Sequence, residues 1–452
     1  MIRAALCMLL ATAALSAQRP ILPRPPAPDL ILFNGKVITV DRGFTVHQAV
    51  AIIGDRIMAV GNDDQMRTVA GPATRMIDLK GLSVIPGLMD NHLHGAGGGP
   101  GVDLSRARSL DDVEAALRVR VAAAKPGDVI VSNSDWHEAQ LKEQRLPLRD
   151  DLDPIAPQNP VVLVRGGHEF IVNSAALTLW NVSEATAEPA GGRITRYADG
   201  RLNGELVDTA KSLVRLPPPP ARTPQQQLDD RIASYKKLNE AGLTGIRHPG
   251  ISIAEYRMLQ EMQKRGQLTI RINALLRPAI GAGGVDPALA ASGIRQNEGD
   301  GLLRIGGIKL AVDGGFEGGL MRDLYEQPWD ENGTFRGLQT IDTERYVTAV
   351  RELNRQDWRV ATHAVGDAAI DLVLNAYERA NTERSIVDRR WSIEHAFIGR
   401  PDHLPRMKAL GVAVSAQNHL YLAGPSLVKY WGAARAGITT PVKMYLDAQV
   451  PV

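Results

Sequence analysis

The chain of 452 residues has a single cysteine, Cys7, which lies in an apolar run close to the N-terminus. The rest of the sequence therefore has no thiol. Disulfide bonds and thiolate metal ligands are excluded there, and a protein without thiols loses nothing by folding in an oxidising compartment.

The sequence also lacks an excess of charge of either sign, because its formal net charge is only +2. No basic stripe could follow a phosphate backbone, so we expect no nucleic-acid partner. A hydrophobic fraction of 44% over this length is typical of a globular protein with a large core. The expected partner is a small-molecule substrate. The oligomeric state stays open, and a homo-oligomer is compatible with the sequence.

The only long apolar run is AALCMLLATAALSA, which follows Met1, Ile2 and Arg3. The run is short for a membrane span and ends in small residues, a pattern that predicts a secretory signal peptide over residues 1–17. We expect cleavage near Ala17, a periplasmic or secreted protein, and no stable membrane anchor after cleavage. The alternative is an uncleaved anchor. Residues 18–28 are rich in proline and predict an extended tether.

Residues 29–85 alternate apolar and polar positions between turn signals such as Asn34-Gly35 and Gly54-Asp55. This pattern predicts antiparallel strands in a small β-sandwich module. From residue 86 to residue 452 short apolar runs alternate with amphipathic stretches, which is typical of strands alternating with helices in a parallel sheet. The expected fold class is α/β, with a (β/α)8 barrel. Residues from about 110 to 216 predict an insertion over the barrel mouth, followed by the proline run 217–220.

The segment VIPGLMDNHLHG places His92 and His94 two positions apart after an apolar strand. Residues at this spacing on a strand point the same way, so both imidazoles could bind one ion. The alternative is that the two histidines flank a solvent-exposed turn.

Three further residues stand at other predicted strands. His363 ends WRVATH and His395 ends RWSIEH, at the position where a barrel carries its active-site groups. Lys309 lies inside the apolar segment GIKLAVDGG, where an unpaired ammonium group is costly. The alternative role for Lys309 is an ion pair with Asp313.

Together these segments resemble the amidohydrolase superfamily, and more narrowly amidohydrolase family 3, which includes N-substituted formamide deformylases. The resemblance extends from about residue 29 to residue 452 and rests on PGLMDNHLH, GIKLAVDGG, THAVGDAAIDLVLNAYE and SIEHAFIGRPDHLPRMKALGVAVSAQ. It implies a metal-dependent hydrolase that acts on a carbon–nitrogen bond other than a peptide bond. GGHEFIVNSAAL also resembles a family segment, and this implies that His168 faces the substrate.

The resemblance implies two divalent metal ions at the strand ends. His92 and His94 would hold one ion, and His363 and His395 the other. Lys309, carboxylated by carbon dioxide, would bridge them. A carbamate would remove the cost of a lone buried ammonium and help to balance two divalent charges. Imidazole and oxygen ligands suit zinc, and leave manganese, iron and nickel open. The ions would activate water for attack on a carbonyl.

The sequence departs from the family pattern in three places. Trp136-His137 stands where the family has Trp-Asp, and Gly315 stands where it has serine, so we expect an altered substrate pocket. After TPVKMYLDAQVPV the family continues with a strand-8 aspartate and more strands of the β module. That aspartate would lie beyond Val452, so the catalytic residue is unassigned. We expect the chain to be a fragment of a longer protein, with weak or absent activity as it stands.

Two other functions remain open. One is a non-catalytic, secreted metal-binding barrel, and the other is an esterase or phosphoesterase on the same metal site.

Among the remaining polar residues, Asp367 is expected to orient the loop after its strand and His248 to be structural. His47, His403 and His419 have no expected role, and GAGGGPG after His94 predicts a flexible loop at the rim of the site.

Overall fold

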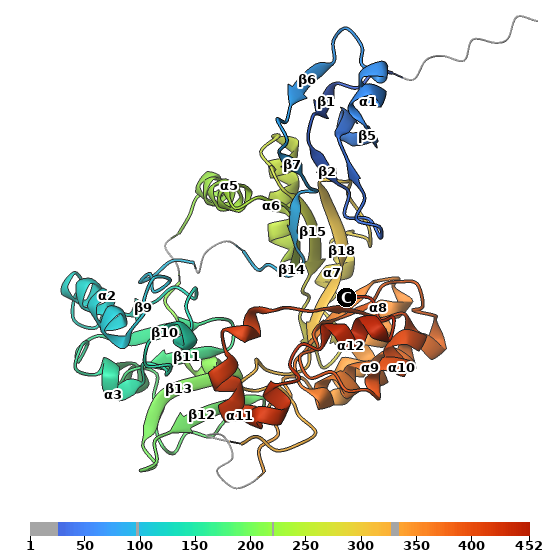
Figure 1. Ribbon diagram of the computed structural model, residues 1–452. Helices are drawn as coiled ribbons and strands as arrows, with labels where there is room; N and C mark the ends of the chain where they lie inside the picture. The colour runs from blue at the N-terminus through green and yellow to red at the C-terminus, as the bar shows by residue number, and fades with distance from the viewer. Residues whose placement is uncertain (1–25, 96–98, 219–220, 327–333) are drawn as a thin grey trace, which may run out of the picture. The chain divides into compact units, whose positions relative to one another are not determined.

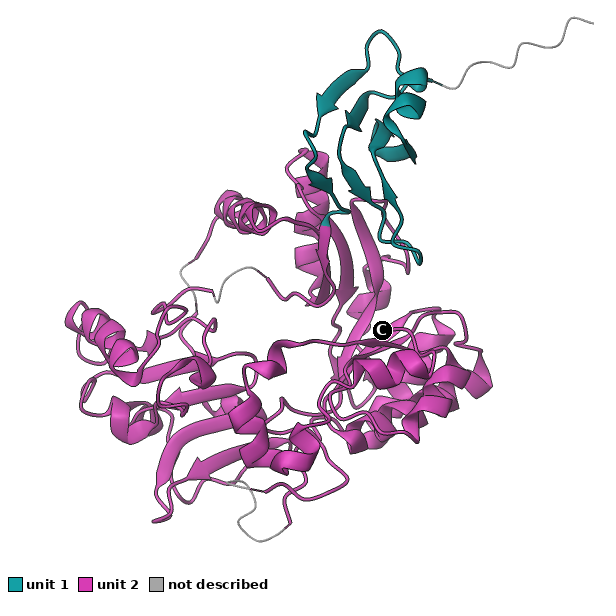
Figure 2. Ribbon diagram, in the orientation of Figure 1, with its two compact units in different colours: residues 1–87 teal, residues 88–452 magenta. Residues whose placement is uncertain are grey.

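The computed structural model describes residues 26–95, 99–218, 221–326 and 334–452. The predicted signal peptide, the tether up to residue 25, and parts of the glycine-rich loop and of the proline run lie outside these residues. The chain divides into two compact units, Met1–Gly87 and Leu88–Val452 (Figure 2).

The first unit contains two small sheets and one helix. One sheet has the order β5-β4-β1-β6, formed by β1 (Leu30–Phe33), β4 (Ala49–Ile53), β5 (Arg56–Gly61) and β6 (Arg75–Asp78). The other has the order β3-β2-β7, formed by β2 (Lys36–Ile38), β3 (Val46–His47) and β7 (Ser83–Val84). Helix α1 (Asp63–Val69) begins with a capping box at Asn62.

The expectation that this module is wholly antiparallel is wrong for two strand pairs. Strands β1 and β6 pair in parallel, and so do β2 and β7. Parallel neighbours need a long connection, and between β1 and β6 it consists of β2 to β5 and α1. The alternation of apolar residues indicated strands correctly, but it carries no information about strand direction.

The second unit contains a sheet of seven parallel strands in the order β21-β20-β19-β18-β15-β14-β8. Figure 1 labels three of them, β14, β15 and β18. The strands are β8 (Leu88–Asp90), β14 (Leu243–Ile251), β15 (Arg271–Leu276), β18 (Leu303–Ala311), β19 (Val360–Ala364), β20 (Ser392–His395) and β21 (Ala413–Ser415). Beyond β21, the N–H of Val414 donates to the carbonyl of Pro451 at 2.8 Å, so the last residues lie beside this strand. The expected parallel β/α sheet is confirmed.

Helices alternate with these strands along the chain. They are α5 (Pro224–Glu240), α6 (Ile253–Lys264), α7 (Ala288–Ala291), α8 (Thr343–Arg355), α9 (Asp367–Glu383), α10 (His403–Leu410), α11 (Gly424–Ala436) and α12 (Val442–Asp447). A short hairpin, β16 (Ile280–Gly281) with β17 (Gly284–Val285), precedes α7. In α8 the residues Tyr346, Val350 and Leu353 are buried, as their helical spacing predicts.

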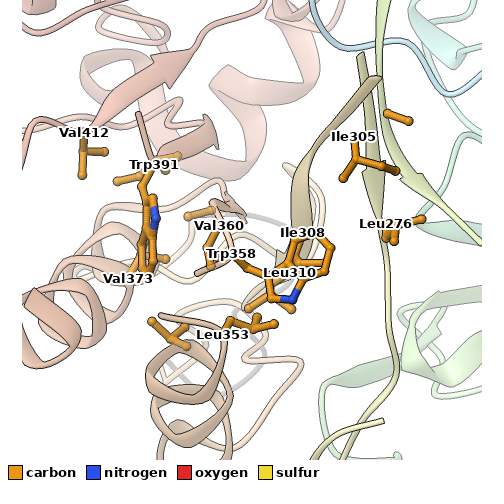
Figure 3. Packing of buried hydrophobic residues seen from close by; sticks show 14 of the residues in the cluster. Leu276, Ile305, Ile308, Leu310, Leu353, Trp358, Val360, Val373, Trp391 and Val412 are labelled. Atoms are coloured by element: carbon orange, nitrogen blue, oxygen red, sulfur yellow. The ribbon is translucent and has the colours of Figure 1, made fainter. Parts of the chain in front are cut away.

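The main core lies between this sheet and its helices. Figure 3 shows side chains of β18, such as Ile308 and Leu310, with Leu353 of α8 and Trp358 in the same cluster. Trp391, which precedes β20, is fully buried and belongs to this cluster. Burying each large apolar side chain contributes on the order of 1.5–3 kcal/mol, so the cluster holds the strand ends in place.

A separate five-stranded sheet occupies the region predicted as an insertion. Its order is β12-β13-β11-β10-β9, formed by β9 (Ile130–Val131), β10 (Val161–Arg165), β11 (Glu169–Val172), β12 (Gly192–Arg196) and β13 (Leu202–Asp208). Three helices accompany it, α2 (Leu110–Ala122), α3 (Arg149–Leu152) and α4 (Ser174–Leu179). Within the described part of the chain, no helix has the length and apolar character needed to cross a membrane.

Candidate metal centre

The four histidines of the predicted metal site come together in the structure. His92 and His94 follow β8, and their Nε2 atoms are 3.2 Å apart. The ring of His395, at the end of β20, lies 4.7 Å from that of His92, measured between centroids. The ring of His363, on β19, lies 4.4 Å from that of His395. His94 is exposed, whereas the side chain of His92 is 4% exposed.

Hydrogen bonds determine which ring nitrogen of each histidine is free to bind an ion. His92 Nδ1 lies 2.7 Å from Oε2 of Glu394, and His395 Nδ1 contacts Oε1 of Gln417. Both Nε2 atoms therefore keep a lone pair. His363 Nε2 donates to the carbonyl of Gly314 at 2.9 Å, which leaves its Nδ1 unprotonated. These partners orient the imidazoles as metal ligands are oriented in proteins.

The protonation of these histidines suits the same role. Burial lowers the pKa of His363 and of His395 well below the usual value, and the nearby cationic side chains lower both further. Burial also lowers the pKa of His92, although its bond to Glu394 opposes the effect. The three imidazoles are therefore neutral near pH 7, the form in which histidine binds metals.

Lys309 on β18 is 3% exposed, and its Nζ has no hydrogen-bond partner among the described residues. Burial lowers its pKa to about 7, against the opposing effect of Glu394. The alternative ion pair with Asp313 is therefore wrong. The Asp313 carboxyl accepts hydrogen bonds from the backbone N–H groups of Leu320, Val365 and Gly366 instead.

His168 reaches the centre from the five-stranded sheet. Its Nδ1 lies 2.6 Å from Oδ1 of Asp208, and its ring lies 5.5 Å from that of His363 between centroids. Asp208 ends β13 with a φ of 47°, a conformation that is uncommon outside glycine. The side chain of His168 is about a third exposed.

Two cavities adjoin the centre. The larger, about 1300 Å³, is lined by residues that include His94, His168, Lys309 and His363. The smaller, about 210 Å³, is lined by residues that include His168, His363 and His395. A substrate that enters either cavity can therefore reach the imidazoles.

Comparison with known proteins decides the family to which this site belongs. The profile of the amidohydrolase family matches residues 75–452. The chain belongs to the amidohydrolase family. The expectation that it is an amidohydrolase, a hydrolase of carbon–nitrogen bonds other than peptide bonds, is thereby confirmed.

Individual relatives cover most of this amidohydrolase. It is 30% identical to the N-substituted formamide deformylase of Arthrobacter pascens over 440 residues, which is 94% of this chain and 79% of that protein. It is 29% identical to the protein LONG AFTER FAR-RED 3 of Arabidopsis thaliana over 440 residues, 91% of this chain and 72% of that protein. The crystal structure of a metal-dependent hydrolase from Pyrococcus furiosus is similar with a TM-score of 0.64 and 25% identity, covering 93% of this chain and 83% of that one.

The donor set of this amidohydrolase fits divalent metal ions. The free ring nitrogens of neutral histidines are metal ligands. The unpartnered Nζ of Lys309 lies buried on the neighbouring strand β18, where an ammonium group would be costly. Modification of Lys309 together with a bound cation would remove the cost of a buried ammonium group. Among the described residues, no side chain forms a hydrogen bond to the amine that would remove this cost.

Sequence reasoning missed the partners that orient the histidines, namely Glu394, Asp208 and Gln417. Glu394 is fully buried on β20 directly before His395, and a charged residue inside the apolar segment RWSIEH was the available signal. Asp208 and Gln417 offered a weaker signal, since each is followed directly by a polar residue, Thr209 and Asn418.

The remaining polar residues fall into different environments. His419 lines the smaller cavity, although the sequence suggested no role for it. His248 is buried on β14. Asp367, the first residue of α9, accepts from the N–H of Arg322 and from Nε of Arg400, which lie in the segments after β18 and β20.

Another cluster has the composition of a metal site. Asp371, Asp402 and His403 place ligand atoms near one another. The guanidinium group of Arg322 bonds all three side chains, so a cation already lies among them. We assign this cluster a structural role.

Proposed function

We propose that this amidohydrolase hydrolyses the carbon–nitrogen bond of a small amide or formamide with two divalent metal ions, most simply zinc. One observation carries the proposal: four imidazoles and the unpartnered amine of Lys309 meet at strand ends of the parallel sheet. The carboxyl ends of such strands are where barrel enzymes place their chemistry.

Each residue has a proposed part in the centre. His92 and His94 would hold one ion, His363 and His395 the other, and a carboxylated Lys309 would bridge them. Carbon dioxide adds to a neutral amine, forming the Nζ–C bond and releasing one proton. A Lys309 pKa of about 7 makes that neutral amine available near neutral pH. The ions, when bound, would polarise the substrate carbonyl and activate water.

The chain's own side chains would position the substrate and move a proton. Asp208 accepts from Nδ1 of His168 and so directs the opposite nitrogen, Nε2, away from the carboxylate. The exposed side of His168 borders both cavities, where Nε2 can bond to the substrate. The name of the Arthrobacter relative supports a formamide as the substrate class.

The test measures metal content and hydrolysis in the full chain. We expect about two metal ions per wild-type chain, and any hydrolysis to be confined to amides and formamides within a panel that also contains esters and phosphoesters. The variants His94→Asn and Lys309→Met should lose metal and activity together. His47→Asn, which changes a histidine on β3 in the first unit, is the matched control and should lose neither.

Two results would contradict the proposal. One is wild-type protein that binds no divalent metal at micromolar concentration. The other is turnover confined to esters or phosphoesters, because the same metal site would then hydrolyse a different class of bond.

A further inference from the structure

The smaller cavity has an apolar wall that reaches the metal centre. Trp136, Phe316 and Phe397 line it, and His363 and His395 lie at the same cavity. Its volume of about 210 Å³ suits one aryl or short alkyl group rather than a large substrate. A group held there would have its attachment point next to the imidazoles.

One buried acidic side chain lies in this wall with an oxygen unused. Glu317 is 1% exposed, and it bonds Arg165 through Oε1. Its Oε2 has no hydrogen-bond partner among the described residues. A Cβ atom added at Gly315 would lie 2.5 Å from this oxygen and 2.8 Å from Cγ of His168. The unused oxygen therefore lies beside His168, which also borders the cavity.

Arg165 holds Glu317 in this position. Its Nε and Nη2 donate to the two carboxylate oxygens of Glu138 at 2.8 and 2.7 Å, so the guanidinium is fixed at one end. It also lies over the ring of Phe316, 4.8 Å from the centroid. Glu169 Oε2 also lies 3.5 Å from Nε of Arg165, so one positive charge is shared among Glu138, Glu169 and Glu317. Glu317 keeps acceptor capacity toward the cavity.

A buried acceptor without a partner determines which ligands the cavity favours. A buried oxygen without a partner is unfavourable until a donor fills it, so a ligand that brings an N–H group is favoured over one that does not. The nitrogen of a secondary amide carries such a donor and an organic substituent. Both would be accommodated by the same cavity, the donor at Glu317 and the substituent at the aromatic wall.

We propose that Glu317 is a substrate-recognition residue, which accepts a hydrogen bond from the N–H group on the nitrogen-bearing half of the substrate. Arg165 is the positioning residue that holds it. The proposal rests on the proposed function, and it restricts that function to secondary amides with a small aryl-alkyl or alkyl substituent. Tertiary amides, which lack the N–H group, would be poor substrates.

The kinetic test compares a secondary phenylmethyl formamide with its N-methylated tertiary analogue. In Glu317→Gln the amide oxygen can still accept from Arg165, while an NH2 donor stands in place of the unused acceptor. We expect kcat/KM for the secondary formamide to fall on the order of tenfold to a hundredfold, as loss of a hydrogen bond to a charged group implies. The value for the tertiary analogue should change less than about threefold. Glu240→Gln, an exposed change of the same charge on α5, should affect neither.

A binding measurement tests the same contact without turnover. Calorimetry on the full chain would use phenylmethylammonium and its N,N,N-trimethyl analogue, which keeps the charge and lacks the N–H donors. We expect Glu317→Gln to weaken only the first ligand, by roughly tenfold or more. Glu317→Leu, which removes the acceptor without adding a group beside His168, should show the same selectivity and serves if Glu317→Gln does not fold.

The outcomes separate the two proposals. Equal losses for both ligands, or no binding of phenylmethylammonium to the wild-type chain, would overturn the recognition role of Glu317. If the wild-type chain hydrolyses neither formamide but the ammonium selectivity holds, the proposed reaction fails while the recognition contact stands.

Discussion

The Nδ1 atom of His92 lies 2.7 Å from Oε2 of Glu394, although 302 residues separate the two in the chain. The same oxygen accepts from Nη1 of Arg247 at 2.7 Å, and the other carboxylate oxygen accepts from Oγ of Ser392 at 2.8 Å. The contact joins the end of β8 to β20 in the buried sheet. It determines which nitrogen of His92 faces the other imidazoles, and it makes that nitrogen more basic.

Replacing Glu394 by glutamine should therefore weaken metal binding. The variant keeps the shape of the side chain but removes the charge that holds the proton on Nδ1 of His92. We expect the affinity for zinc to fall roughly tenfold to a hundredfold, as for other partners of metal-binding histidines. A competition titration against a chromogenic chelator measures this. Unchanged affinity, with Glu240→Gln as the control, would count against the role of Glu394.

Asp208→Asn should impair turnover without removing metal. The asparagine can present its NH2 group to Nδ1 of His168, which would favour the tautomer that leaves the wrong nitrogen protonated. We expect kcat/KM to fall on the order of tenfold to a hundredfold, as loss of a correctly directed hydrogen bond to the substrate implies. Metal analysis of the same sample is the internal control. A parallel loss of metal would indicate that Asp208 supports the fold of the site rather than His168.

Glu169 should make the stability of the protein depend on pH. Its side chain is fully buried and neither oxygen has a hydrogen-bond partner among the described residues. Burial raises its pKa well above the usual value, Arg165 opposes this, and the nearby Glu205 raises the pKa further. Above about pH 4.5 the unfolded chain loses this proton while the folded chain keeps it. The contribution of Glu169 to stability is therefore fully present below that pH and declines as the pH rises.

Glu169→Gln removes this titration and keeps the shape of the side chain. We expect it to raise the free energy of unfolding more at pH 8 than at pH 5. Urea unfolding at both pH values measures the difference, with Glu240→Gln as the exposed control. A gain of equal size at the two pH values would show that Glu169 is ionised in the folded protein.

The N-terminal segment predicts export, which we propose for the intact protein. Expression in a Gram-negative host followed by fractionation should place the protein in the periplasm, with a mature N-terminus at or near Gln18 by Edman sequencing. Deleting residues 1–17 should retain the protein in the cytoplasm. An N-terminus at Met1 in a membrane fraction would indicate the uncleaved anchor instead.

Much of the metal centre could be predicted from local sequence. Each of His363 and His395 belongs to an apolar strand, and His92 and His94 follow one, so strand position alone indicated that they meet at one edge of the sheet. Only the alternative role for Lys309, an ion pair with Asp313, was wrong, because Asp313 bonds to backbone N–H groups instead. It also assigned an antiparallel direction to β6 and β7, since alternation of side chains is the same in both directions.

The sequence by itself determined the strands, the helices between them and the histidines at the strand ends, because periodicity and burial act over a few residues. Only the tertiary structure decided the partners of those histidines and the unused oxygen of Glu317. Glu394 is 302 residues from His92, and Arg165 is 152 residues from Glu317. Such contacts exist only after the core has brought distant strands together, because a hydrogen bond needs its two atoms within about 3 Å of each other.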